Sequence, residues 1–216
     1  MLNPSFASIV RNSPIIPVLH MESIDDAVNV SRALYRGGIV NAEIVLRSSV
    51  ALDCVAAVSE HVPEMNVGVG TLISQQQVKD AVTAGAKFLV SPSFTRALAT
   101  TMLDTGLPIL PGVVTPSEIT QALELGINEV KFFPAQQYGG ANAIKALSGV
   151  FSQVLFCPTG GVSPSNIADY FSIKNVFAVG GSWMVPKDIV ANKNWQGITQ
   201  LSRQALGLIN SQNKFS

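Results

Sequence analysis

Short apolar runs recur along the chain and alternate with segments that have the polar and apolar pattern of amphipathic helices. The first residues of successive runs are 21 to 27 positions apart. Apolar runs of this length are typical of buried strands, and their alternation with helices predicts a parallel sheet. The eight runs are IIPVL from Ile15, AEIVL from Ala42, NVGVG from Asn66, KFLVS from Lys87, PILPG from Pro108, EVKFF from Glu129, QVLFC from Gln153 and VFAVG from Val176.

The intervening segments carry the start and stop signals of helices. One runs from the capping residue Ser74 to Gly85, and another from Thr115 to Gly126. Capping side chains at the start and glycine at the end are typical of amphipathic helices. Because the spacing is even and no long linker interrupts it, we expect a single (β/α)8 TIM barrel with a short N-terminal extension, as one domain over residues 1–216.

A doubly wound open sheet is the alternative architecture. Its dinucleotide-binding form needs a third glycine after the first pair, but the segment that begins at Gly68 and Gly70 has Ile73 there. We therefore do not interpret this segment as a cofactor site.

Composition restricts the classes of partner. The chain has 216 residues, of which 47% are hydrophobic and 13% charged, and its formal net charge is zero. This indicates a large core, with burial in an oligomer as one way to cover apolar surface. There is no cluster of Lys and Arg for a nucleic acid and no apolar run long enough for a membrane span. The first residues lack a signal pattern, so we expect a cytoplasmic protein, and Cys54 and Cys157 are expected to be reduced structural thiols.

Lys131 interrupts a run that otherwise reads as a buried strand, Val130-Lys131-Phe132-Phe133-Pro134. Lysine is seldom fully buried without a partner, and burial disfavours its charged form. A neutral amine attacks carbonyl groups, so a buried lysine suits Schiff-base chemistry. The alternative is a lysine at a strand end whose ammonium group reaches solvent along its methylene stem.

The second strand, expected from Ala42 to Arg47, carries two charged residues. Alternation along a strand puts Glu43 and Arg47 on one face, which points into the barrel if the apolar residues between them face the helices. The two lie about 13 Å apart along the strand, which disfavours the alternative of an ion pair between them. The same alternation puts Phe133 on the face of Lys131, as an apolar wall or as ordinary core. An arginine, an amine and a carboxylate together suit a keto acid.

The last two strands each run into a glycine loop, Gly160-Gly161 and Gly180-Gly181-Ser182. Loops after strands 7 and 8 of such barrels frequently bind phosphate through backbone N–H groups. Three further residues lie at expected strand ends. Thr71 can bond a carboxylate or a water, Pro92 shapes the rim, and His20 is accessible there, although a solvated loop histidine is its simplest interpretation.

Five segments together resemble the family of 2-keto-3-deoxy-6-phosphogluconate (KDPG) and 4-hydroxy-2-oxoglutarate (KHG) aldolases: GIVNAEIVLRS, VGVGTLIS, VKFFPA, FCPTGGVSPSN and VGGSWMVP. The resemblance runs from about Ile15 to Ala205 and implies a (β/α)8 class I aldolase. It further implies a homotrimer that needs no metal or other cofactor. The chain departs from the family at His20, where many members are apolar or basic, and at Gln136-Gln137-Tyr138.

The resemblance also implies roles for individual residues. Lys131 would form the Schiff base and Glu43 would move protons. The pyruvoyl part of the substrate would be surrounded by Arg47, Thr71, Pro92 and Phe133. Thr159 would contact the hydroxylated chain, and the phosphate would be held by Gly160, Gly161 and Ser182, beside Gly181 of the second glycine loop.

The expected activity is cleavage of KDPG to pyruvate and glyceraldehyde 3-phosphate, with action on KHG as well, in the Entner–Doudoroff pathway. Three alternatives stay open. The first is the same chemistry on the galactonate epimer or on KHG alone. The second is another phosphate-binding barrel, an isomerase or synthase, in which Lys131 is only a charge. The third is a non-catalytic binder of sugar phosphates or an oligomeric scaffold.

Overall fold

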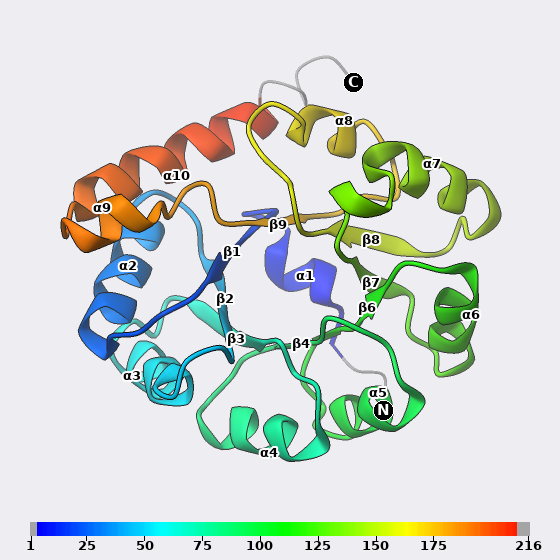
Figure 1. Cartoon of the computed structure of the whole chain (residues 1–216), viewed down its shortest axis with the longest axis horizontal. Coiled ribbons are helices and arrows are strands. Elements are labelled where there is room, and N and C mark those ends of the chain that lie inside the picture. The colour runs from blue at the N-terminus through cyan, green and yellow to red at the C-terminus, as the bar shows by residue number, and fades with distance from the viewer. Residues whose placement is uncertain (1–3, 211–216) are drawn as a thin grey trace.

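The computed structural model describes residues 4–210. Parallel strands surround the centre of the molecule and helices pack outside them (Figure 1). Within these residues the strands form one six-stranded sheet, in the order β5-β4-β3-β2-β1-β9, and one three-stranded sheet, β6-β7-β8. Their bounds are β1 Ile15–Leu19, β2 Asn41–Val45, β3 Asn66–Gly70, β4 Leu89–Val90, β5 Ile109–Leu110, β6 Gly112–Val113, β7 Glu129–Phe132, β8 Leu155–Pro158 and β9 Val179–Gly181.

The two sheets adjoin at two places where strand pairing is interrupted. Pro111 separates β5 from β6, so the run predicted from Pro108 as one strand is divided in two, because proline has no N–H to donate. On the other side, β8 meets the chain around β9 through two isolated parallel bridges, Phe156–Val176 and Thr159–Gly180. The described chain is therefore an α/β fold whose two parallel sheets share one centre.

The helices that follow the strands begin where the polar pattern predicts. The side chain of Ser74 accepts a hydrogen bond from Gln77 N at the start of α4. Thr115 and Glu118 cap each other's backbone at the start of α6, which satisfies N–H groups that have no partner inside the helix. The helices are α1 Phe6–Val10, α2 Ile24–Arg36, α3 Ala51–His61, α4 Gln75–Thr83, α5 Arg96–Leu103, α6 Pro116–Glu124, the 3-10 turn η1 Gln136–Tyr138, α7 Gly140–Val150, α8 Ile167–Phe171, α9 Lys187–Ala191 and α10 Trp195–Asn210.

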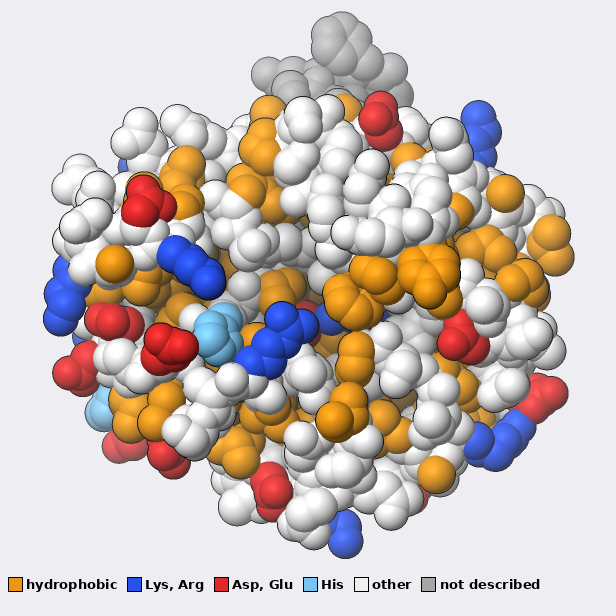
Figure 2. All heavy atoms as spheres, viewed as in Figure 1, with side chains coloured by type: hydrophobic (Ala, Val, Ile, Leu, Met, Phe, Trp, Pro, Cys, Tyr) orange, Lys and Arg blue, Asp and Glu red, His pale blue; other side chains and the backbone are white. Residues whose placement is uncertain are grey.

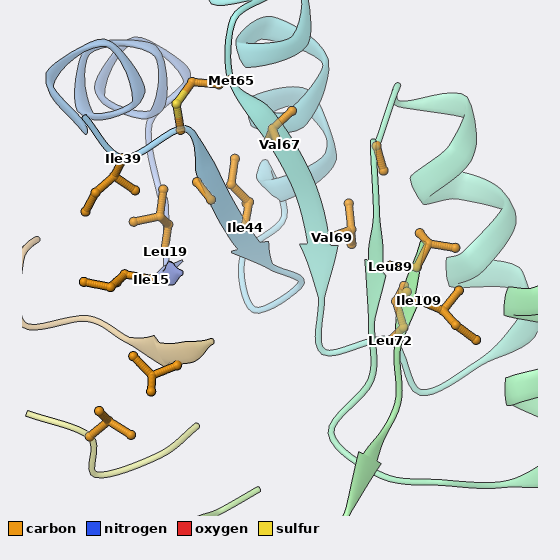
Figure 3. Close-up of a cluster of buried hydrophobic side chains, with 14 of the residues drawn as sticks. Ile15, Leu19, Ile39, Ile44, Met65, Val67, Val69, Leu72, Leu89 and Ile109 are labelled. Atoms are coloured by element: carbon orange, nitrogen blue, oxygen red, sulfur yellow. The ribbon is translucent and has the colours of Figure 1, made fainter. Parts of the chain in front are cut away.

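Buried apolar side chains form two layers. The larger lies between the strands and the surrounding helices, and Figure 3 shows part of it. In that layer Ile44 of β2 and Val130 of β7 are fully buried. The smaller cluster is made of Phe6, Val10, Ile16, Phe88, Val90, Leu110, Cys157 and Ala178. It combines strand residues with α1, so the opposite faces of the strands also pack on apolar side chains.

The start of helix α1 is held against the strands by hydrogen bonds to Glu129, the first residue of β7. Its carboxylate accepts hydrogen bonds from Ser5 Oγ and Phe6 N, both at 2.5 Å, and from Ala7 N at 3.3 Å. A carboxylate is stabilised at the positive end of a helix. The Phe6 ring packs edge-on against Phe88 at 5.0 Å between ring centroids. In Figure 1, α1 therefore lies at the centre of the ring of strands.

Among the helices described, none is long and apolar enough to cross a membrane.

Candidate active site

The site is centred on Lys131 of β7 and Glu43 of β2. The Lys131 Nζ donates hydrogen bonds to both carboxylate oxygens of Glu43, at 3.1 Å to Oε1 and 3.4 Å to Oε2. Lys131 is 4% exposed and Glu43 2%. The lysine side chain therefore does not reach solvent, and its partner is Glu43. The shared interior face that strand alternation predicts for these two residues is present.

Backbone alternation and one glycine, Gly70, allow this contact. On β2 and β7 the neighbouring residues Ile44 and Val130 turn outward into the helix-facing core, which leaves Glu43 and Lys131 on the inner face. Gly70 at the end of β3 leaves the space for the carboxylate, since a Cβ atom there would lie 1.8 Å from Glu43 Oε1. Gly112 of β6, beside Lys131 in register, similarly makes room for the chain at Pro92.

Two further side chains adjoin Lys131. Its Nζ lies 5.1 Å from the centroid of the Phe133 ring, within the range of a cation–π contact. Cys157 of β8 is its partner in register on the other side and is fully buried. Burial raises the pKa of the Cys157 thiol to about 12, against the opposing effect of the Lys131 charge. The thiol thus stays protonated at neutral pH and does not compete with the lysine as a nucleophile.

Thr71 directly follows β3, and Pro92 comes two residues after the end of β4. Thr71 comes directly after Gly70 and has a φ of 64°. For a β-branched residue this left-handed conformation is rare and costs about 1–3 kcal/mol, and strain of this kind is concentrated at functional sites. A Cβ atom on Gly112 would lie 2.4 Å from the Pro92 carbonyl carbon. The backbone of Pro92 therefore lies against the strand position next to Lys131.

Arg47 is not part of the second strand, which ends at Val45. The prediction that the strand extends to Arg47 is wrong, because the chain turns there: Arg47 N donates to Val45 O at 2.8 Å. The arginine is instead exposed in the loop that follows. No ion pair joins it to Glu43 in the described structure.

The two glycine loops lie side by side. Thr159 forms a parallel bridge with Gly180, where a Cβ atom would lie 2.3 Å from the threonine Oγ1. Gly160 and Gly161 have φ values of 95° and 80°, which favour glycine. A Cβ atom on Gly161 would lie 2.4 Å from Gln136 Cβ, and one on Gly181 would lie 2.1 Å from the Trp183 ring. These glycines are therefore also required by packing.

A cavity of about 570 Å³ has Arg47 and Ser182 in its wall. Val45, which also lines this cavity, is two residues after Glu43 on β2. Figure 2 shows basic side chains and one histidine gathered at the hollow in the middle of this face. The cavity also contains His20 and a residue that the sequence analysis did not select, Lys187 at the start of α9. Its place a few residues after the last glycine loop is the signal that could have suggested it.

The described residues include no group of three or more His, Cys, Asp or Glu side chains placed to hold a metal ion.

A buried lysine beside a glutamate, on the inner face of parallel strands, is an arrangement suited to Schiff-base chemistry. It indicates that the chain belongs to the class of lyases that cleave carbon–carbon bonds. Residues 6–201 match the aldolase family described as KDPG and KHG aldolase. The chain is 41% identical over 202 residues to the KHG/KDPG aldolase of Escherichia coli K12, covering 94% of this chain and 95% of that protein. It is 37% identical to the 2-dehydro-3-deoxy-phosphogluconate aldolase of Dickeya dadantii, with the same coverage.

Solved structures give the same result. The KDPG aldolase of Legionella pneumophila, with pyruvate captured at low pH as a covalent carbinolamine intermediate, superimposes with a TM-score of 0.89 at 41% identity. That match covers 92% of this chain and 96% of the other. The chain therefore belongs to the KDPG and KHG aldolase family, and the family predicted from the five sequence segments is confirmed.

Proposed function

We propose that this chain is a class I aldolase that cleaves 2-keto-3-deoxy-6-phosphogluconate to pyruvate and glyceraldehyde 3-phosphate, and that it also acts on 4-hydroxy-2-oxoglutarate. The observation that carries the proposal is the buried contact of 3.1 Å between Lys131 Nζ and Glu43 Oε1. A lysine amine beside a carboxylate, on the dry inner face of a parallel sheet, supplies both the nucleophile and the proton acceptor that a Schiff-base cleavage needs.

The reaction follows from these two groups. The free amine of Lys131 attacks the C2 carbonyl, and loss of water gives an iminium. Glu43, through a bound water, takes the proton of the C4 hydroxyl, and the C3–C4 bond breaks with its electrons drawn into the iminium. Glyceraldehyde 3-phosphate leaves, the enamine is protonated at C3, and hydrolysis of the imine releases pyruvate. Acid–base help of this kind accelerates a reaction about 10²–10⁴-fold.

The remaining predicted residues hold the substrate. Arg47 binds the carboxylate with its planar fork of donors. Thr71, Pro92 and Phe133 enclose the pyruvoyl part, and Thr159 contacts the hydroxylated chain. The phosphate is held by Gly160, Gly161, Gly181 and Ser182. Two observations support this assignment: Arg47 and Ser182 share one cavity, and the KDPG aldolase of Zymomonas mobilis ZM4, 38% identical with a TM-score of 0.85, has been solved with 3-phosphoglycerate.

We also propose how the strands close and how the chain is organised into domains. The strands close into an eight-stranded TIM barrel in a single domain over residues 1–216, with β5 and β6 as one bent strand. The two bridges between β8 and the chain around β9 support closure. We further propose a cytoplasmic homotrimer that works in the Entner–Doudoroff pathway. The low charged fraction, 13%, and the exposed side chains of Tyr138 and Val150 support an oligomer.

The test is release of pyruvate from the two substrates and from the galactonate epimer, assayed separately. The proposal predicts cleavage of KDPG and of KHG. Cleavage of KHG alone, or of the epimer in preference to KDPG, would restrict the chemistry to those alternatives. No cleavage of any of the three would favour a different phosphate-binding enzyme or a binding protein.

A further inference from the structure

Two polar residues precede the Lys131–Glu43 pair at matching positions. Glu129 is the first residue of β7, two before Lys131, and Asn41 is the first residue of β2, two before Glu43. Because side chains alternate along a strand, each shares the inner face with the member of the pair that follows it. Both strands of the pair thus begin with a polar side chain on the inner face.

One N-terminal segment, residues 5–13, binds both of these side chains. The Glu129 carboxylate accepts three hydrogen bonds from residues 5–7, at the start of α1. Asn41 is fully buried, and its Nδ2 donates to the backbone oxygen of Ser13 at 3.1 Å, just after the end of α1. The Asn41 Oδ1 accepts from Asn66 Nδ2, also at 3.1 Å, so both ends of the Asn41 amide have partners.

The segment connects strands that the sheets keep apart. In the described chain β2 belongs to the six-stranded sheet and β7 to the three-stranded one. The helix α1 between the two attachment points lies at the centre of the ring of strands (Figure 1). The N-terminal segment therefore joins the strand of Glu43 to the strand of Lys131 through the interior of the molecule.

Apolar packing brings the same segment to the pair. Phe6 of α1 is fully buried in the smaller apolar cluster, which also contains Cys157. Cys157 is in register with Lys131 on the neighbouring strand. Burial raises the pKa of its thiol to about 12, and the charges of Lys131 and Glu43 act on it in opposite directions. The cluster that contains Phe6 thus adjoins both members of the pair.

We propose that Glu129 and Asn41 are positioning residues for the Schiff-base reaction, an inference that rests on the proposed function. Through residues 5–13 they fix β7 relative to β2, and so hold Lys131 Nζ at 3.1 Å from Glu43 Oε1. Catalytic groups need such support from residues that do not touch the substrate. A displacement of about 1 Å at a catalytic group can reduce turnover about 10²-fold.

The positions of these residues predict which kinetic constant changes. Glu129 and Asn41 begin their strands, whereas Arg47 and Ser182 come after the last residues of β2 and β9. In parallel strands these are opposite ends, so loss of the support should leave substrate binding in place. The turnover number kcat should therefore fall while KM stays within about twofold, which is the pattern of an interaction that acts only in the transition state.

The experiment measures kcat and KM for KDPG in Glu129→Leu, Glu129→Gln, Asn41→Leu and the double variant Glu129→Leu/Asn41→Leu. Each kcat is expressed per mole of chain that saturating pyruvate and borohydride label, so unfolded chains do not count. Asn175→Leu is the matched control, because the Asn175 amide also donates to backbone oxygens, those of Ser152 and Val154, but outside this segment. Urea unfolding of each preparation shows how far it is destabilised.

Glu129→Leu and Asn41→Leu should each lower kcat about ten- to a hundredfold. Glu129→Gln should keep most of the activity, because its amide can still accept from the backbone and donate to Ser5 Oγ. The double variant should be about as slow as the slower single variant, since both changes release the same segment. Asn175→Leu should lose stability but keep the wild-type kcat.

Wild-type kcat in labelled Glu129→Leu and Asn41→Leu would overturn the inference. So would a fall in kcat for Asn175→Leu as large as theirs, or a fall in the double variant equal to the product of the two single falls. In each of these cases the wild type would still cleave KDPG, and the proposed function would stand. A wild type that neither traps pyruvate nor cleaves KDPG would overturn both.

Discussion

Gly70 of β3 faces the carboxylate of Glu43 so closely that a Cβ atom at position 70 would lie 1.8 Å from Oε1. The two residues belong to neighbouring strands, and Gly70 pairs in register with Val45. The position of Glu43 beside Lys131 thus depends on the absence of a side chain on the next strand. Gly68, on the same strand, makes room in the same way for the ring of Phe88.

The first prediction concerns this space. Gly70→Ala should force the Glu43 carboxylate away from Lys131, and a displacement of about 1 Å at a catalytic group can reduce turnover about 10²-fold. The extra methyl group should also lower the free energy of unfolding by about 1–3 kcal/mol. Turnover and urea unfolding measured on the same preparation separate the two effects.

Gly149→Ala is the matched control. Gly149 is exposed in α7 and a Cβ atom there would meet nothing within 4 Å. This change should stabilise the helix by about 0.5–1 kcal/mol without altering turnover. Full activity of Gly70→Ala would show that Glu43 does not need its observed position.

Glu43→Gln should separate adduct formation from turnover. Glutamine keeps the shape of the side chain and an oxygen that can accept from Lys131, but it cannot take up a proton. Trapping of pyruvate should therefore persist while cleavage becomes about 10²–10⁴-fold slower. Borohydride trapping and steady-state rates measure the two. If both fell together, Glu43 would serve to position the lysine or to stabilise the fold.

Arg47→Lys should weaken the binding of pyruvate. The exposed position of Arg47 predicts a change in unfolding free energy within about 0.5 kcal/mol, since surface substitutions seldom do more. Loss of one hydrogen bond to a charged group should raise the pyruvate concentration for half-maximal trapping at least about tenfold. An unchanged pyruvate concentration would assign Arg47 to another role, such as orienting Thr71.

Ser182→Ala should discriminate between the two substrates. A hydrogen bond to a charged group contributes about 1.5–3 kcal/mol, so kcat/KM for KDPG should fall about ten- to a hundredfold. KHG carries no phosphate, and its loss should be clearly smaller. Equal losses on the two substrates would place Ser182 near the reacting carbons, and the phosphate assignment would have to be withdrawn.

Much of the fold could be predicted because local pattern determines it. The strands β1 and β3 begin at Ile15 and Asn66, where the apolar runs begin. Thr115, predicted as a capping residue, is the N-cap of α6. Alternation along two strands predicted that Glu43 and Lys131 share the interior face, whereas their direct contact was not predicted. The family followed from the order of five segments. Each of these inferences uses short-range pattern or the order of segments along the chain.

Other features depend on contacts that local pattern does not contain. Glu129 caps α1 across 123 residues of chain, so its role cannot be read from its neighbours. The end of the second strand at Val45 depends on a turn in which Arg47 N returns to the Val45 oxygen. Gly70 resembles part of a cofactor motif in sequence, whereas in space it accommodates Glu43.

The most direct test of the central claim is reduction with borohydride in the presence of pyruvate, followed by mass spectrometry of the peptides. A single reduced pyruvoyl adduct, on Lys131, is expected. Folded Lys131→Arg should show neither adduct nor turnover, because the guanidinium stays protonated. An adduct on another lysine, or an active Lys131→Arg enzyme, would show that Lys131 is not the Schiff-base residue.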